Sequence, residues 1–254
     1  MNFNDGNTIN IFTDASTTTY NGETYVSAGA VAIIGENYNN IIDQQVNVMK
    51  NTNNYGELYA IYLAIMMALK LRCSFPGATI NILSDSKISV YGLREWSFSW
   101  LKNQVKFNTY NFINSSGNNV ANQELFKHII LTICSNNLCV RFFHVKGHIN
   151  FNNFKDLAYA QNKFKTMNNI NIPPSTVVTF SIMNDYIDNF TRNQFKVINL
   201  HGINTNGLPL FYFNFQGSPR MRRKYKSLIS KWYKNFIVKE NYNGQQNYYK
   251  GRNH

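Results

Sequence analysis

The sequence has little cysteine, few acidic residues and no long apolar run. Three cysteines in 254 residues are an odd number and too few for a disulfide scaffold, which indicates reduced thiols and a cytoplasmic setting. The polar first ten residues lack the features of a signal peptide. The longest apolar run, residues 61–69, is far shorter than the roughly 18 residues of a membrane span. We therefore expect a cytoplasmic, monomeric protein without a membrane partner.

The shortage of acidic residues leaves the chain strongly basic. It contains 25 Lys and Arg against 13 Asp and Glu, a net charge of +12. The excess lies mainly in residues 171–254, which hold 12 basic and 3 acidic side chains. Such an excess is typical of proteins that bind a polyanion, nucleic acid above all, and a solubilising surface is the alternative.

Short β-branched segments and longer apolar segments follow one another through the first two thirds of the chain. Three consecutive strands separated by turn residues predict a meander, and a helix that is apolar on nearly every side comes next. The predicted strands are residues 8–13, 25–34, 41–49, 78–83 and 138–145, and the predicted helices are residues 55–71, 84–100, 120–134 and 154–167. This order predicts an α/β fold with a mixed five-stranded sheet, a three-strand meander plus two parallel strands, flanked by helices.

Two adjacent prolines, Pro173 and Pro174, interrupt this pattern. Because proline pairs are typical of breaks between structured units, we expect one domain over residues 1–170 and a small basic α+β domain over residues 176–254.

The second unit contains a basic amphipathic helix after residue 219. Its polar face is consistent with binding to nucleic acid phosphates. Docking of its apolar face on the first domain, or contact with another partner or a membrane surface, is the alternative. The basic residues that we assign to nucleic-acid binding are Arg222, Arg223 and Lys226.

Four acidic residues lie at the ends of predicted strands or at the beginnings of predicted helices. Asp14 ends the first strand and Asp85 ends the fourth, while Glu57 and Asp156 lie in the first turns of two helices. Adjacent strands would place Asp14 and Asp85 side by side, with Glu57 packed over them. Each residue alone is as readily explained as a helix cap, but a group of carboxylates is the oxygen ligand set that Mg²⁺ or Mn²⁺ prefers.

Two cysteines and two histidines raise the alternative of a zinc site, namely Cys134, Cys139, His144 and His148. A strand through residues 138–145 would place Cys139 and His144 on opposite faces of the sheet, which argues against zinc.

The segments around the four acidic residues resemble the type 1 ribonuclease H family. The matching stretches are INIFTDAS around Asp14, TNNYGEL around Glu57, ILSDSK around Asp85, and HVKGH followed by FKDLA around Asp156. Between them, LREWSFSWLKN resembles the tryptophan-containing helix of the family and the start of its basic protrusion. The resemblance covers residues 8–167, with the motifs in the order and spacing of the family.

This resemblance implies an endoribonuclease that hydrolyses the RNA strand of RNA–DNA hybrids by a two-metal-ion mechanism and leaves 5′-phosphate and 3′-hydroxyl ends. The implied cofactor is a pair of Mg²⁺ or Mn²⁺ ions. The implied ligands are Asp14, Glu57, Asp85 and Asp156, and the implied proton-handling residue, on a mobile loop, is His148.

The resemblance also implies how an RNA–DNA hybrid would be bound. Trp96 and Trp100 would form a channel for the DNA strand, although core packing is the alternative for both. Lys146 would lie near the substrate as a positive charge. The DNA phosphate would be bound by Thr52 and Asn122, and the RNA side would be lined by Ser16, Asn53, Asn54, Ser86 and Lys87.

Several departures from the family concern substrate binding rather than chemistry. Tyr55 stands where the family often has arginine, Ala15 replaces a common glycine, and residues 102–119 carry only two lysines. Two alternatives to hybrid cleavage therefore stay open. One is a catalytically silent RNase H-like protein that binds nucleic acid, and the other is a two-metal nuclease that acts on another duplex.

Overall fold

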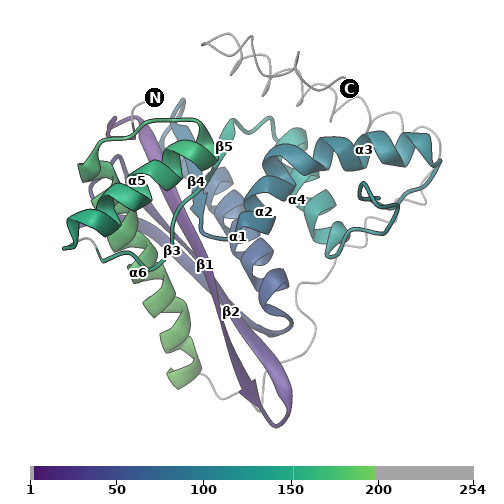
Figure 1. Cartoon of the computed structure of the whole chain (residues 1–254), viewed down its shortest axis with the longest axis horizontal. Coiled ribbons are helices and arrows are strands. Elements are labelled where there is room, and N and C mark those ends of the chain that lie inside the picture. The colour runs from purple at the N-terminus through teal and green to yellow at the C-terminus, as the bar shows by residue number, and fades with distance from the viewer. Residues whose placement is uncertain (1–2, 151, 198–254) are drawn as a thin grey trace.

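A five-stranded sheet forms the centre of residues 3–150 and 152–197, the part of the chain that the computed structural model describes (Figure 1). The strands lie in the order β3-β2-β1-β4-β5. The first three form an antiparallel meander, and β4 and β5 run parallel to β1. The strand bounds are β1 (Thr8–Tyr20), β2 (Glu23–Ile34), β3 (Ile41–Lys50), β4 (Thr79–Ser84) and β5 (Val140–His144). The predicted mixed sheet is confirmed.

The β1–β2 hairpin is longer than the sequence predicted, because β1 continues seven residues past the expected end at Thr13. Asn21 and Gly22 form the connecting turn, with φ values of 51° and 77°. This left-handed backbone at both positions is the geometry of the tight hairpin turn that Asn-Gly favours. Both strands reach the turn in full register, so that Asp14 pairs with Gly29 near the middle of the hairpin.

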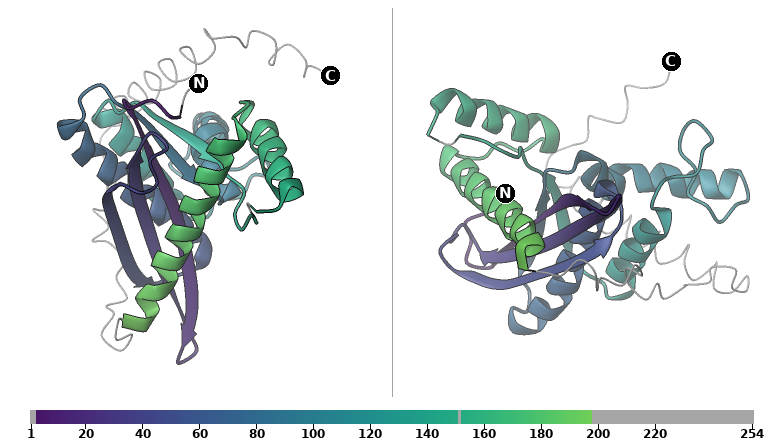
Figure 2. Two further views of the ribbon diagram at one scale, coloured as in Figure 1. Left: turned by 90° about the vertical axis from the view of Figure 1, so that its left-hand side faces the viewer. Right: turned by 90° about the horizontal axis from the view of Figure 1, so that it is seen from below.

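Helices cover both faces of the sheet, and each face has its own hydrophobic core. On the first face, α1 packs against Ile9 and Ile11 of β1, together with residues of α4. On the opposite face, α5 and α6 pack against Phe12, Val31 and Ile33. Figure 2 shows α6 crossing one face of the sheet while α1 lies on the other. The helix bounds are α1 (Asn53–Ser74), α2 (Lys87–Tyr91), the π-helical turn η1 (Gly92–Trp96), α3 (Ser97–Lys106), α4 (Gln123–Ser135), α5 (Phe154–Asn168) and α6 (Pro174–Val197).

Helix α6 corrects the predicted domain boundary. The prolines that were expected to end the first domain instead begin a helix, since the fixed φ of Pro174 suits a first helical position. The helix buries Val177, Phe180, Met183 and Ile187 in the second core. The first domain therefore extends at least to Val197, and a separate unit does not begin at residue 176. The rest of the predicted second domain, including Arg222, Arg223 and Lys226, lies outside the described residues.

Helix α1 lies unusually close to the sheet at its N-terminal end. A Cβ on Gly56 would overlap the side chain of Val26 and would lie 3.1 Å from the Cβ of Ala15. Only glycine permits this approach. It brings the next residue, Glu57, down to the strands.

Two buried asparagines connect β1 and β4. Asn10 and Asn81 are register partners, and Asn81 Nδ2 donates to Asn10 Oδ1 at 2.8 Å. Asn10 Nδ2 in turn donates to the backbone carbonyls of Phe3 and Gly35 at 3.1 and 2.6 Å. Because buried amides must find hydrogen-bond partners, this pair favours one alignment of the two strands.

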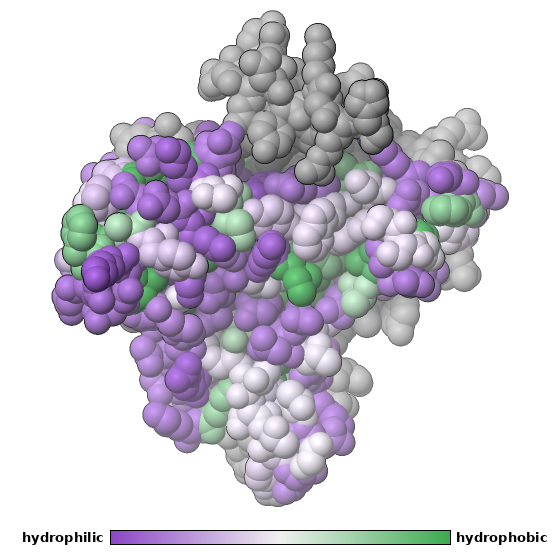
Figure 3. All heavy atoms as spheres, viewed as in Figure 1, coloured by the Kyte–Doolittle hydropathy of each residue, from purple (hydrophilic) through white to green (hydrophobic). Residues whose placement is uncertain are grey.

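The described surface is mixed in character. On the face shown in Figure 3, apolar residues occur in small separate groups among hydrophilic ones. Among the helices of the described residues, none combines the length and the apolar character that a membrane crossing requires.

Candidate active site

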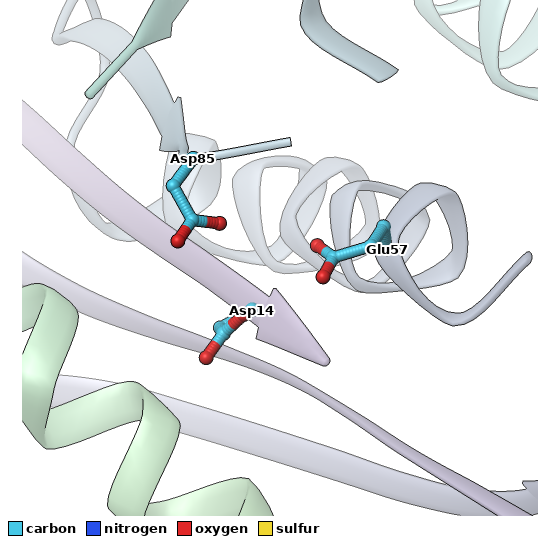
Figure 4. A group of neighbouring side chains, drawn as sticks. All are labelled: Asp14, Glu57 and Asp85. Carbon is cyan, nitrogen blue, oxygen red and sulfur yellow. The ribbon is translucent and has the colours of Figure 1, made fainter. Parts of the chain in front are cut away.

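Three carboxylates meet at the point where β1 and β4 come alongside the first turn of α1 (Figure 4). Oxygen atoms of Asp14, Glu57 and Asp85 all lie within 4.8 Å of one another. Asp14 and Asp85 are neighbours because β1 and β4 pair in parallel, with Thr13 opposite Ser84 one residue earlier. Glu57 points to them from α1. The sequence predicted a group of four carboxylates, and the structure brings these three together.

Glu57 is buried beside the other two carboxylates. The residue is only 8% exposed, and its Oε2 has no hydrogen-bond partner among the described residues. Burying a carboxylate without a partner is costly unless a cation is bound. The hard oxygen donors and the unpartnered Oε2 therefore fit a divalent ion such as Mg²⁺ or Mn²⁺.

The carboxyl groups bind protons more tightly than isolated carboxyl groups do. Burial, and next the charge of Asp85, raise the pKa of Asp14 to about 8, although the Ala15 amide donates to its Oδ1 at 2.8 Å. Burial, with the charges of Asp14 and Asp85, raises the pKa of Glu57 well above its usual value. Burial also raises the pKa of Asp85, and the charges of His148 and Lys146 oppose this shift. Like charges in a desolvated site favour protonation, and a bound cation would reverse that preference.

The expected fourth carboxylate, Asp156, is not part of this group. It lies half-buried in the first turn of α5, outside the set of oxygens within 4.8 Å of one another. A different acidic residue, Asp188 of α6, carries a charge that raises the pKa of Asp14, Glu57 and Asp85 alike. Asp188 was not among the predicted site residues, because no helix was expected over residues 174–197. The signal was present in the spacing of the buried α6 residues, which recur every three or four positions from Val177 to Ile187.

Polar groups of α6 contact β1 directly, two residues after Asp14. Thr191 Oγ1 lies 2.9 Å from Ser16 Oγ, and Ser16 Oγ donates to Asp188 Oδ1 at 3.5 Å. Asp188 accepts two hydrogen bonds from Arg192 Nη2, each of 2.7 Å. Ser16, which we expected to line the RNA side, is thus half-buried against α6.

The loop after β5 closes over Asp85. Gly147 is buried, and a Cβ at this position would overlap Asp85 Oδ2. His148 is exposed with a left-handed backbone, φ 52°, and its charge lowers the pKa of Asp85. Lys146 is half-buried and donates from Nζ to the carbonyl of Gly147 at 2.7 Å. The structure therefore places His148 and Lys146 beside the carboxylates, and their roles stay predictions.

His144, the last residue of β5, holds the backbone of Asp85 from inside the protein. Its Nε2 donates to the backbone carbonyl of Asp85 at 3.0 Å. Burial lowers the pKa of His144 to about 4, so the imidazole is neutral at pH 7. Within the described residues, the only group of candidate metal ligands is the acidic one.

The two tryptophans differ in their surroundings. Trp100 is only 7% exposed, and its ring packs against Phe112 and Phe126 at centroid distances of 5.6 and 5.1 Å. Trp96 is 38% exposed and lies 6.0 Å from the ring of Tyr91. Trp100 is therefore packed in the core, the alternative to a role in the DNA channel, whereas Trp96 is accessible to a substrate.

The other predicted binding residues lie at helix N-termini. Thr52 caps α1, and its Oγ1 accepts from the Tyr55 amide at 3.3 Å. Asn122 precedes α4 with a left-handed backbone. Helix N-termini favour phosphate groups, so these positions are compatible with the predicted contacts. The remaining members of this set, exposed or half-buried at the starts of α1 and α2, are Asn53, Asn54, Ser86 and Lys87.

A comparison with protein families agrees with this geometry. The model of the RNase H family matches residues 6–163, more than half of the chain. The chain belongs to the RNase H family. It is accordingly a ribonuclease H, a hydrolase with nuclease activity. A search of the curated proteins found no match to this sequence.

Solved RNase H structures also resemble the chain. The RNase H domain of PFV, solved in solution, is 17% identical, and the match covers 62% of this chain and 92% of that one with a TM-score of 0.47. LC11-RNase H1 in complex with an RNA/DNA hybrid is 15% identical, with coverages of 54% and 84% and a TM-score of 0.38. RNase H1 from the halophilic archaeon Halobacterium salinarum is 13% identical, with coverages of 64% and 98% and a TM-score of 0.33.

Proposed function

We propose that this ribonuclease H cleaves the RNA strand of RNA–DNA hybrids internally, uses two divalent ions, Mg²⁺ or Mn²⁺, and leaves 5′-phosphate and 3′-hydroxyl ends. The observation that supports this most directly is the convergence of Asp14, Glu57 and Asp85, with one oxygen of Glu57 buried and unpartnered. Carboxylates so arranged suit hard divalent cations. Family membership supports the same reaction.

The carboxylates would bind the ions. When bound, two divalent ions supply positive charge at the attacking water and at the leaving 3′ oxygen of the phosphodiester. Asp14, Glu57 and Asp85 hold them through their oxygens. His144 fixes the backbone of Asp85 by the hydrogen bond from its Nε2, which keeps that carboxylate in place.

Proton transfer is assigned to the loop after β5. The imidazole of His148, exposed beside Asp85, takes up the proton that the attacking water loses. His148 has a left-handed backbone, and it directly follows Gly147, which lies against Asp85. A base at this position is near the carboxylates yet accessible to solvent.

Recognition of the hybrid is assigned to the surface around the carboxylates. A site selective for hybrids must contact the 2′-hydroxyl on one strand and exclude it on the other. We assign the RNA side to Asn53 and Asn54 at the start of α1 and the DNA side to the exposed ring of Trp96. Trp100 supports that ring from the core, with the two centroids 6.4 Å apart.

The basic C-terminal segment is assigned to general affinity for nucleic acid. Residues 198–254 carry 10 basic and 1 acidic side chains. Contacts between basic side chains and phosphates weaken with salt, so removing this segment should reduce the salt dependence of hybrid binding. An unchanged salt dependence in the shortened chain would contradict this assignment.

The reaction is tested with labelled RNA–DNA hybrid, duplex RNA and duplex DNA, each incubated with Mg²⁺ or Mn²⁺. We expect cleavage of the hybrid alone, with 5′-phosphate ends, and loss of cleavage in Asp85→Asn. Asp43→Asn is the matched control, because Asp43 pairs with Lys70 on the surface and removal of its charge should leave cleavage intact. Binding without cleavage would favour the silent alternative, and cleavage of duplex RNA or duplex DNA would favour the other nuclease.

A further inference from the structure

Asp188 lies on a helix that the family match does not include. The match ends at residue 163, and α6 begins at Pro174. The helix nevertheless packs directly behind the carboxylates. A Cβ on Gly29, the register partner of Asp14, would lie 2.7 Å from Thr191 Cγ2 and 3.1 Å from Ile187 Cδ1.

The position of Asp188 follows from these contacts. It lies between Ile187 and Thr191 on α6, and its side chain is 13% exposed. Ser16, two residues after Asp14 on β1, donates a hydrogen bond to it at 3.5 Å. The carboxylate of Asp188 is therefore held at the same stretch of β1 that supplies Asp14.

Asp188 is a fourth acidic side chain beside β1. Its oxygens, like those of Asp156, lie outside the set within 4.8 Å of one another, but its hydrogen bond with Ser16 holds it two residues along β1 from Asp14. Arg192 is its one ion-pair partner among the described residues, and the Arg192 side chain is 61% exposed. Lys146 and His148 add positive charge beside Asp85, but exposed and half-buried cations are weak counter-charges for four carboxylates, two of which are buried.

The buried polar atoms that have no partner among the described residues include two that bear on the ions. Glu57 Oε2 is one, and Asn184 Nδ2, one helical turn before Asp188, is the other. Asn184 is only 2% exposed, and its Nδ2 lies 3.4 Å from the position of a Cβ on Gly147, beside Asp85. An unpartnered carboxylate oxygen beside further carboxylates indicates a cation, since no group in the described part of the chain pairs with it.

We propose that Asp188, and not Asp156, is the fourth carboxylate of the ion-binding site, and that α6 is a wall of the active site in this chain. Asp188 contributes its oxygens to the divalent ions from the side of β1 opposite α1. The inference deepens the proposed function, because it concerns the ions that function requires. The fourth carboxylate thus comes from α6, whereas the sequence predicted that it comes from α5.

The test is Mn²⁺ binding measured by isothermal titration calorimetry on the full chain without nucleic acid. We expect Asp188→Asn to weaken Mn²⁺ binding by about 10-fold or more, the effect typical of losing a group that holds or orients a metal. Asp156→Asn should weaken it less. Asp43→Asn is the matched control, because Asp43 is 12% exposed and forms one ion pair of 3.0 Å, much as Asp188 does.

A second variant separates the carboxylate from its ion pair. Arg192→Gln removes the partner of Asp188 and leaves the carboxylate. If Asp188 holds ions, this variant should bind Mn²⁺ at least as tightly as the unmodified protein, because a repelling positive charge is lost. Equal weakening in Asp188→Asn and Arg192→Gln would show that the pair only holds the helix in place, and would overturn the proposal.

The remaining outcomes are equally decisive. Unchanged Mn²⁺ binding in Asp188→Asn, with weakened binding in Asp156→Asn, would restore the assignment from sequence. Thermal melts in EDTA show whether each variant is folded before titration. If the unmodified protein binds Mn²⁺ through Asp188 but does not cut the hybrid, the proposed function fails while this inference stands.

Discussion

Gly147 lies directly against the carboxylate of Asp85, with no room between them for a methyl group. The residue at 147 is therefore part of the geometry of the site although it has no side chain. The loop after β5 can pass this close to a predicted metal ligand only because glycine lacks a Cβ. The neighbouring residue, His148, gains its position beside Asp85 from the same approach.

Gly147→Ala should therefore reduce hybrid cleavage strongly without unfolding the protein. The added methyl group must displace either the loop or the Asp85 carboxylate, and a displacement near 1 Å in a catalytic group can cost about 100-fold in rate. Steady-state cleavage and a thermal melt measure the two effects. Gly6→Ala is the control, because a Cβ at Gly6 meets nothing within 4 Å. Full activity in Gly147→Ala would show that the loop moves away from Asp85 freely.

The raised pKa of Asp14 predicts how the ion-free protein responds to pH. The group ionises near its ordinary value of 3.8 in the unfolded chain and at about 8 in the folded one. Between these values the folded protein keeps a proton that the unfolded chain has lost. This contribution to the free energy of unfolding is complete below pH 3.8 and is lost as the pH rises through about 8.

Melting temperatures in EDTA between pH 5 and pH 8.5 test this dependence. Asp14→Asn should flatten the decrease and should be more stable than the unmodified protein at the upper end, because one buried negative charge is removed. Asp43→Asn should keep the original slope. Added Mn²⁺ should stabilise the unmodified protein more at high pH, since ions and protons compete for the same oxygens. A stability that rises with pH in EDTA would contradict the raised pKa.

Close packing of α6 on β2 predicts a stability effect at Gly29. In Gly29→Ala the new methyl group would press on Thr191 and Ile187, and overpacking of this kind costs about 1–3 kcal/mol. Urea unfolding measures the loss. Thr191→Ala removes the nearer methyl group, so the double variant should lose less than the sum of the single variants. Simple additivity would show that Gly29 and α6 are not in contact.

The two tryptophans should respond in opposite ways to truncation. Trp100→Ala removes a buried ring and should cost about 3–5 kcal/mol of unfolding free energy. Trp96→Ala should change the stability by less than about 0.5 kcal/mol, as is usual for exposed positions, but should weaken hybrid binding. Urea unfolding and a filter-binding assay separate the two effects. Equal loss of binding with intact stability in both variants would mean that Trp100 also reaches the substrate.

Shortening the chain tests the correction of the domain boundary. A protein that ends at residue 175 loses all the apolar residues of α6 and exposes Phe12, Val31 and Ile33, so it should not fold. A protein that ends at Val197 keeps every described core residue and should give a cooperative thermal transition. A stable, active protein ending at residue 175 would place α6 outside the core.

Sequence reasoning predicted the sheet well because its signals are local. The β-branched strands and the order of strands and helices indicated the meander and the parallel strands, and the carboxylates at strand ends then indicated the site. The length of β1 was underestimated because the polar residues after Asp14 look like a loop, although they pair with β2 up to the turn at Asn21. Pairing with a partner strand decides this, and that partner is not visible in a local window.

The errors concern contacts between distant parts of the chain. The residues around Pro174, considered alone, predict a domain boundary, yet Pro174 begins the helix that covers the second face of the sheet. Asp156 stands in a family-like segment, but the sequence could not show that Asp188, 174 residues after Asp14, interacts with the same carboxylates. The burial of Trp100 depends on Phe112 and Phe126, which meet it only in the folded protein.

The asparagine pair between β1 and β4 has a consequence for the distant carboxylates. Asp14 lies four residues after Asn10, and Asp85 lies four residues after Asn81, so the two offsets are equal. A slip of one residue between the strands would move the carboxylates about 3.3 Å further apart. It would also break the hydrogen bond between the two asparagine side chains. The spacing on which nuclease chemistry depends is thus set about 13 Å away, by two neutral side chains that never meet the substrate.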